Sequence, residues 1–109
     1  MTTFLLNDDP EDFNESNEYL EYVVKEKIAT FEISEKLRTL SEIATSQNKK
    51  IIIDLKNCEQ CDSTFLGMMT RIAIQQNNQN KKIFVKNGNK DILENIQSLG
   101  IHRFFEFTN

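Results

Sequence analysis

Apolar side chains recur every three or four residues in three segments of the chain, and this spacing predicts three amphipathic helices. In the last of them, Ile92, Ile96 and Leu99 share one stripe and are expected to face the core. Between the helical segments lie short runs of β-branched and aromatic residues, which are typical of strands. The expected helices contain residues 33–44, 65–76 and 91–99, and the expected strands contain residues 19–24, 51–55 and 82–86.

Strands and helices alternate along the chain, so we expect a small α/β domain with at least two β-α-β crossovers. The run Ile51-Ile52-Ile53-Asp54-Leu55 is almost entirely apolar, which is typical of a strand covered on both faces in a parallel sheet. Three aromatic residues follow the last helix: Phe104, Phe105 and Phe107. We expect them to pack against the core, either as an edge strand or as a docked tail.

The length of 109 residues fits one domain. Lys and Arg number 13 against 17 Asp and Glu, a net charge of −4, so the chain has no broad attraction to phosphate backbones or anionic membranes. No apolar stretch reaches the roughly 18 residues of a membrane span, and the first residues lack the pattern of a secretion signal. We therefore expect a cytoplasmic protein that binds neither nucleic acid nor membrane.

The acidic residues are concentrated at the start of the sequence. Residues 1–21 hold seven acids and no base, and acidic, amide-rich segments of this kind are often mobile. We therefore expect residues 1–18 to form an acidic arm, mobile or loosely docked, with Phe13 among its possible anchors. Residues 19–109 are expected to form the folded domain.

Two cysteines occur as Cys58-Glu59-Gln60-Cys61, a spacing found in redox pairs and in halves of zinc sites. A structural zinc usually needs four ligands, and His102 is the single histidine. A redox pair is expected at the start of a helix rather than after a strand. We therefore expect two small apolar side chains at a strand end, with a thiol oxidoreductase as the alternative, and no metal or cofactor.

Functional residues of α/β sheets gather at the carboxyl ends of the strands. The strand over residues 51–55 leads through the cysteine loop into Asp62-Ser63-Thr64, three residues that favour the start of a helix. This loop is therefore the candidate site. Taken alone, Ser63 would be a capping residue without a regulatory role, and Asp62 would cap the helix or orient the loop.

The strand at 51–55, the short loop after it and the run Asp62-Ser63-Thr64-Phe65-Leu66-Gly67 resemble the STAS domain, in particular the bacterial anti-sigma factor antagonists with their Asp-Ser-Ser/Thr-x-Leu-Gly motif. The resemblance extends over about residues 20–107. It implies a single domain with a small mixed, largely parallel sheet and helices packed mainly on one face.

The resemblance also implies a phosphorylation switch and not an enzyme. Ser63, with Thr64 as second choice, would be phosphorylated by a GHKL-type serine kinase that is itself the anti-sigma factor, and dephosphorylated by a PP2C-type phosphatase. The unphosphorylated protein, a monomer or weak dimer when free, would bind the kinase and release the sigma factor. Asp62, Ser63, Thr64, Phe65 and Gly67 would form the partner surface.

Two points stay open at this level. Phe65 has the helical spacing of a core residue but stands beside the acceptor, where it could anchor a partner, and Gly67 is expected to let a neighbouring element approach closely. The alternative function is a constitutive STAS interaction subunit, for example of a transport ATPase, which would use the same surface without phosphorylation.

Overall fold

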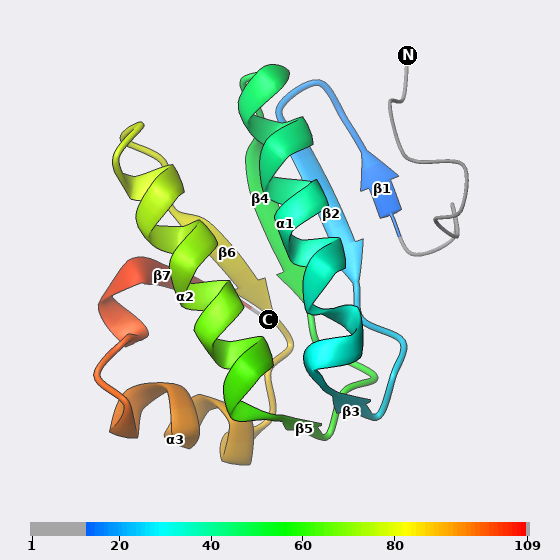
Figure 1. Cartoon of the computed structure of the whole chain (residues 1–109), viewed down its shortest axis with the longest axis vertical. Helices are drawn as coiled ribbons and strands as arrows, with labels where there is room; N and C mark the ends of the chain where they lie inside the picture. The colour runs from blue at the N-terminus through cyan, green and yellow to red at the C-terminus, as the bar shows by residue number, and fades with distance from the viewer. Residues whose placement is uncertain (1–12, 109) are drawn as a thin grey trace.

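The computed structural model describes residues 13–108, and its main element is a five-stranded sheet. The strands follow the order β1-β2-β4-β6-β7, with β1 antiparallel to β2 and all other neighbours parallel (Figure 1). The predicted mixed, largely parallel sheet is therefore confirmed. The strands are β1 (Phe13–Glu15), β2 (Tyr19–Val23), β4 (Lys50–Asp54), β6 (Ile83–Lys86) and β7 (Phe105–Thr108).

Two helices, α1 (Phe31–Ser46) and α2 (Ser63–Asn77), lie side by side on one face of the sheet (Figure 1). Parallel strands that follow one another in both sequence and space are joined by crossovers of one hand, which place successive helices on the same face. The shorter α3 (Lys90–Ser98) lies beyond the carboxyl ends of the strands (Figure 1). A 3₁₀ turn (His102–Phe104) then leads into β7.

The core lies between this face of the sheet and the two helices. Alternate strand residues point into it, such as Leu20 and Tyr22 of β2 and Ile51 and Ile53 of β4, and none of these is exposed. The helices contribute the stripes that their periodicity predicts. The fully buried residues from α1 and α2 include Leu37, Leu40, Ala44, Phe65, Met69 and Ala73.

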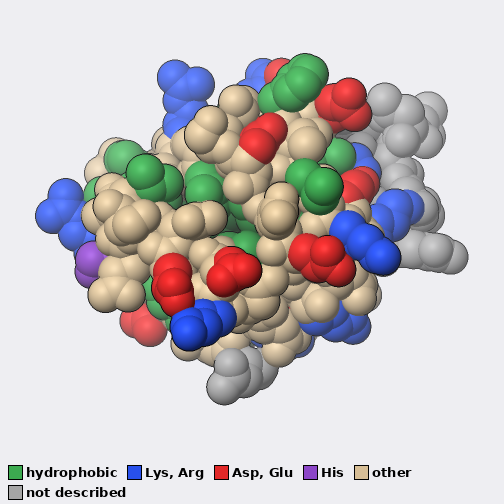
Figure 2. Space-filling model, turned by 90° about the horizontal axis from the view of Figure 1, so that it is seen from below, with side chains coloured by type: hydrophobic (Ala, Val, Ile, Leu, Met, Phe, Trp, Pro, Cys, Tyr) green, Lys and Arg blue, Asp and Glu red, His purple; other side chains and the backbone are tan. Residues whose placement is uncertain are grey.

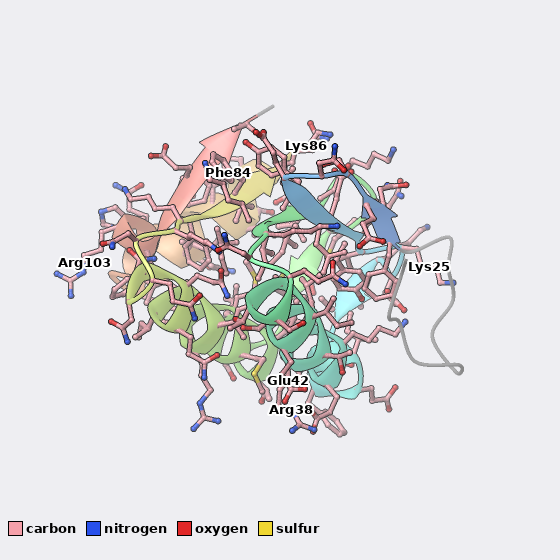
Figure 3. All side chains as sticks on the ribbon, turned by 90° about the horizontal axis from the view of Figure 1, so that it is seen from above. Lys25, Arg38, Glu42, Phe84, Lys86 and Arg103 are labelled. Atoms are coloured by element: carbon pink, nitrogen blue, oxygen red, sulfur yellow. The ribbon has the colours of Figure 1, made fainter. Side chains whose placement is uncertain are left out.

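The opposite face of the sheet is not covered by a helix within residues 13–108. Figure 3 shows Phe84 and Lys86 on this face, with Arg38 and Glu42 of α1 on the other side of the molecule. Ile52 also lies here, next to Phe84 in the ladder, and is only half-buried. The expectation that the strand at 51–55 is covered on both faces is therefore wrong, because the helices occupy only one face.

The sheet includes part of the segment that the sequence predicts to be an acidic arm. Phe13 is 6% exposed and stacks on Tyr22 at 5.2 Å between ring centroids, and Glu15 forms a 2.7 Å ion pair with Lys49. Residues 13–15 thus belong to the sheet, because the buried aromatic contact adds to the ladder hydrogen bonds. Residues 1–12 of the expected arm lie outside the described part of the chain.

Two very short strands were not predicted. β3 (Ile28–Ala29) and β5 (Gln60–Cys61) pair in parallel as a second sheet, with Ala29 opposite Cys61. Two-residue strands have no sequence period of their own. This small sheet joins the segments that precede α1 and α2. None of the helices in the described residues is long and apolar enough to cross a membrane.

Candidate functional site

Asp62 connects the first turns of two helices. As the N-cap of α2, its Oδ1 accepts a 2.7 Å hydrogen bond from the backbone N–H of Phe65, and its Oδ2 accepts a 3.1 Å bond from the N–H of Phe31 at the start of α1. Its own N–H donates to the carbonyl of Ala29 at 2.8 Å. The first N–H groups of a helix lack intrahelical partners and favour a negative charge. One carboxylate therefore satisfies donors of both helices, and the expected capping role of Asp62 is confirmed.

Ser63 is the first residue of α2, and its side chain is exposed, as is that of Thr64. Both hydroxyl groups lie where the positive end of the helix dipole favours an added anion. The structure therefore places both predicted acceptors at the surface and at a helix N-terminus. This is the end of the molecule at which the parallel strands finish (Figure 1).

The elements on both sides of Ser63 carry exposed apolar side chains. Towards α1, Ile28 and Phe31 are 55% and 62% exposed. Towards α3, a hollow of about 210 Å³ is lined by Cys61, Ser63, Leu66, Asn95, Ser98 and Leu99. Figure 2, seen from this end, shows apolar side chains interspersed with acidic ones. The exposed acidic side chains of the elements at this end include Glu32, Glu59, Asp91 and Glu94.

We call Ile28, Phe31, Ser63, Thr64 and Leu99 the Ser63 surface. Sequence reasoning missed its apolar members. Leu99 was expected to face the core, but it is 58% exposed because α3 ends at Ser98 and the hollow lies beside it. Phe31 immediately precedes the apolar stripe of α1 without belonging to it. An aromatic residue that lies outside the apolar stripe of an amphipathic helix is expected at the surface, and Phe31 could have been identified in this way.

Phe65 belongs to the core and not to the surface. Its side chain is 0% exposed, so no partner can contact it in the folded protein, and only its backbone N–H takes part in the site through Asp62. The proposed partner anchor at this position is therefore corrected. The helical period of α2 directs the side chain at this position towards the sheet.

Gly67 does not serve the role that the sequence predicted. A Cβ atom built on it would meet nothing within 4 Å, so no other element of the described chain approaches there. Glycine inside a helix costs about 0.5–1 kcal/mol relative to alanine. This glycine therefore carries a stability cost that packing within the described residues does not explain.

The two cysteines face each other directly before α2. Their Sγ atoms are 4.0 Å apart, and Cys58 is buried while Cys61 is half-buried. The hydrogen bond from Cys61, followed by a backbone hydrogen bond at Ala29, lowers the pKa of the Cys58 thiol to about 7 despite its burial. The same hydrogen bond, together with burial, raises the pKa of Cys61. Cys58 belongs to the apolar core as expected, and its thiol is in contact with that of Cys61.

Within residues 13–108, no three His, Cys, Asp or Glu side chains gather in a way that could hold a metal ion. His102 is exposed in the 3₁₀ turn, away from the Ser63 surface, and lines a separate hollow with Leu93, Gln97 and Phe107. The structure therefore brings together Asp62, Ser63 and Thr64, with Gly67 one turn further along α2.

Comparison with solved structures identifies the fold as that of STAS-domain anti-sigma factor antagonists, as the sequence predicted. A candidate anti-sigma factor antagonist from Thermotoga maritima matches with a TM-score of 0.75 and 14% identity, over 89% of this chain and 84% of that one. The anti-sigma factor antagonist SpoIIAA, in its unphosphorylated form, matches with a TM-score of 0.65 and 13% identity, over 89% and 86%. No protein-family model matches the chain. No curated protein matches it either.

Proposed function

We propose that this protein is an anti-sigma factor antagonist whose binding is switched off by phosphorylation of Ser63. The observation that carries the proposal is the position of Ser63, exposed on the first turn of α2 and beside a hollow that it lines together with the exposed Leu99. The fold shared with anti-sigma factor antagonists supports the same role. The description of one SpoIIAA structure as an unphosphorylated form agrees with a switch of this type.

In the unphosphorylated state, the Ser63 surface binds a GHKL-type serine kinase that acts as the anti-sigma factor. The exposed apolar side chains of this surface are Ile28, Phe31 and Leu99. Their removal from water by a partner makes the free energy of binding more favourable. Gly67 lies one turn from Ser63 on α2 and leaves the helix backbone open to close approach. Binding the kinase frees the sigma factor, in the cytoplasm of a bacterium.

In the phosphorylation step, the kinase supplies the bound ATP and the base, and this chain supplies the hydroxyl group of Ser63. The Ser63 Oγ attacks the γ-phosphorus of ATP, the bond between that phosphorus and the bridging oxygen of ADP breaks, and a base of the kinase takes the hydroxyl proton. Asp62 does not serve as that base, because both of its carboxylate oxygens accept backbone hydrogen bonds. Its part is to position Ser63 by fixing the start of α2.

The phosphoryl group adds a charge of about −1.5 to −2. The N-terminus of α2 favours this charge, so the fold of the domain persists. The surrounding acidic side chains, Glu59 and Asp91 among them, and the apolar contacts disfavour its burial under a partner. Binding is therefore lost while the structure is retained, and a PP2C-type phosphatase restores it by hydrolysing the phosphate ester.

Intact mass measured before and after incubation with ATP, Mg²⁺ and GHKL-type kinases of the same genome tests the proposal. We expect one added phosphate, about 80 Da, in the natural protein and in Thr64→Ala, and none in Ser63→Ala. Thr64→Ala is the matched control because it removes the neighbouring hydroxyl from the same helix turn. Modification that persists in Ser63→Ala and disappears in Thr64→Ala would move the acceptor to Thr64.

Binding measurements separate the switch from a constitutive interaction subunit, for example of a transport ATPase. We expect Ser63→Ala to bind the kinase as the natural protein does, and Ser63→Asp to lose binding because it carries a negative charge. Equal binding by both variants, with no phosphorylation by any candidate kinase, would favour the constitutive subunit. Sedimentation of the free protein checks the accompanying expectation of a monomer or weak dimer.

A further inference from the structure

The cysteine loop brings the only two thiols of the chain together beside the candidate site. Cys58 and Cys61 are the two cysteines of the sequence, and their Sγ atoms lie 4.0 Å apart. A disulfide requires about 2.05 Å, so the two sulfurs must approach by about 2 Å. Cys61 lines the hollow next to Ser63, so one of the two thiols borders a solvent-filled space.

We propose that Cys58 and Cys61 form a reversible intramolecular disulfide on oxidation by a peroxide, and that this bond changes the hydrogen bonds through which Asp62 caps α1 and α2. The disulfide is a property of the loop and does not depend on the proposed function. The disulfide would be a second covalent modification of this region, next to Ser63 but independent of its phosphorylation.

The chemistry needs one peroxide molecule for each pair. The Cys58 thiolate attacks one peroxide oxygen, the O–O bond breaks, and hydroxide leaves, so that Cys58 becomes a sulfenic acid. The Cys61 sulfur then attacks the Cys58 sulfur, the S–O bond breaks, and water departs with the Cys61 proton. Two electrons pass from the two thiols to the peroxide, and a thiol reductant reverses the reaction by exchange.

The ionisation of the pair supports this order of events. The hydrogen bond from Cys61 lowers the pKa of Cys58 to about 7, so that a large part of Cys58 is thiolate near neutral pH, and the thiolate is the nucleophile. Cys61, with its raised pKa, keeps its proton and acts second.

The coupling to Asp62 follows from how the loop is held. Cys58 is 3% exposed within the core, and its N–H donates to the carbonyl of Leu55 at 3.0 Å. Side-chain Nδ2 of Asn89, the N-cap of α3, donates to the carbonyl of Glu59 at 3.0 Å. Cys61 is held as well, since it lies in β5 opposite Ala29, and the carbonyl of Ala29 accepts a 2.8 Å hydrogen bond from the N–H of Asp62. Both ends of the loop are therefore fixed, and closing the gap between the sulfurs strains the backbone at Asp62, the residue next to Cys61, and with it the two caps.

Alkylation and mass spectrometry of the full chain test the disulfide. The reduced protein should accept two alkyl groups when unfolded in the presence of the reagent, and the peroxide-treated protein should accept none, with full recovery after addition of a dithiol. Cys61→Ser is the matched control, since it should retain an oxidised Cys58 that reacts with a sulfenic acid probe. Two alkylated thiols after a peroxide dose that oxidises free N-acetylcysteine in the same tube would overturn the disulfide.

Backbone amide resonances test the coupling. Oxidation should shift the amide signals of Phe31 and Phe65, whose N–H groups donate to Asp62, and should leave that of Asn48 at the far end of α1 unchanged. If those two amides remain in place in a fully oxidised sample, the coupling is wrong. Both readouts are obtained without a partner, so failure of the proposed function does not affect them.

Discussion

The carboxylate of Asp62 accepts a 3.1 Å hydrogen bond from the backbone N–H of Phe31, a residue 31 positions earlier in the chain. The same carboxylate caps α2 through Phe65. This relationship joins the starts of α1 and α2 and thereby sets the distance between an exposed aromatic side chain and the candidate acceptor Ser63. The Ser63 surface is thus assembled by a residue that contributes little surface itself.

Removing the carboxylate should destabilise the protein more than the loss of an ordinary cap. Replacing an N-cap Asp by Ala costs about 0.5–2 kcal/mol, and the orphaned Phe31 donor adds to it, so we expect about 1–3 kcal/mol for Asp62→Ala in urea unfolding. Asp62→Asn is the control, because its amide oxygen retains one cap and should recover about half of the loss. Equal stability of Asp62→Ala and the natural protein would contradict the double cap.

Two glycines should respond to alanine with opposite signs. Gly67 is helical and has no neighbour within 4 Å of a built Cβ, so Gly67→Ala should raise the free energy of unfolding by about 0.5–1 kcal/mol. Gly100 ends α3 with φ of +72°, where alanine is strained, so Gly100→Ala should lower it by about 1 kcal/mol. Thermal unfolding of both variants checks this, and a destabilised Gly67→Ala would reveal a contact at that position.

If Gly67→Ala is stable but binds the proposed partner kinase more weakly, the role of this glycine in binding is separated from its effect on stability. The glycine would then be retained for the approach of the partner, in line with the trade-off between stability and activity seen at binding surfaces. Unchanged binding would show instead that the partner does not contact this turn of α2.

Two phenylalanines near Ser63 should behave differently. Phe65 is fully buried, and its replacement by alanine should cost about 3–5 kcal/mol of stability through the cavity left behind. Phe31 is 62% exposed, so Phe31→Ala should change stability by no more than about 0.5 kcal/mol but should weaken binding of the proposed partner kinase. Urea unfolding and calorimetric titration measure the two effects. Binding unaffected by Phe31→Ala would remove that residue from the partner surface.

The reactivity of Cys58 should depend on pH with a midpoint near neutrality. The pKa of its thiol is lowered to about 7 by the hydrogen bond from Cys61, so the rate of alkylation should rise as pH increases through this value. In Cys61→Ala the hydrogen bond is lost, and burial then disfavours the thiolate, so the midpoint should move to higher pH. Rates of iodoacetamide reaction from pH 5 to 10 measure it, and a midpoint near 9 in both proteins would contradict the hydrogen bond.

The amino-acid pattern is sufficient to predict those features of the protein that depend on neighbouring residues. Helical stripes in α1 and α2 and the β-branched run of β4 predicted these elements, because periodicity and propensity act within a few residues. Asp62 as an N-cap and Ser63 at a helix start followed for the same reason. The α/β fold followed from the alternation of the elements.

Features that depend on contacts between distant segments could not be predicted in this way and are known from the folded structure. Which residue Oδ2 of Asp62 binds, whether Leu99 is covered, whether Gly67 has a neighbour and how far apart the thiols lie are all set by packing. Strand β1 is of the same kind, since its Phe13 is buried where it stacks on Tyr22 of the neighbouring strand. The periodicity of a helix or strand determines which side chains share a face. Which residues that face contacts depends on how the elements pack together.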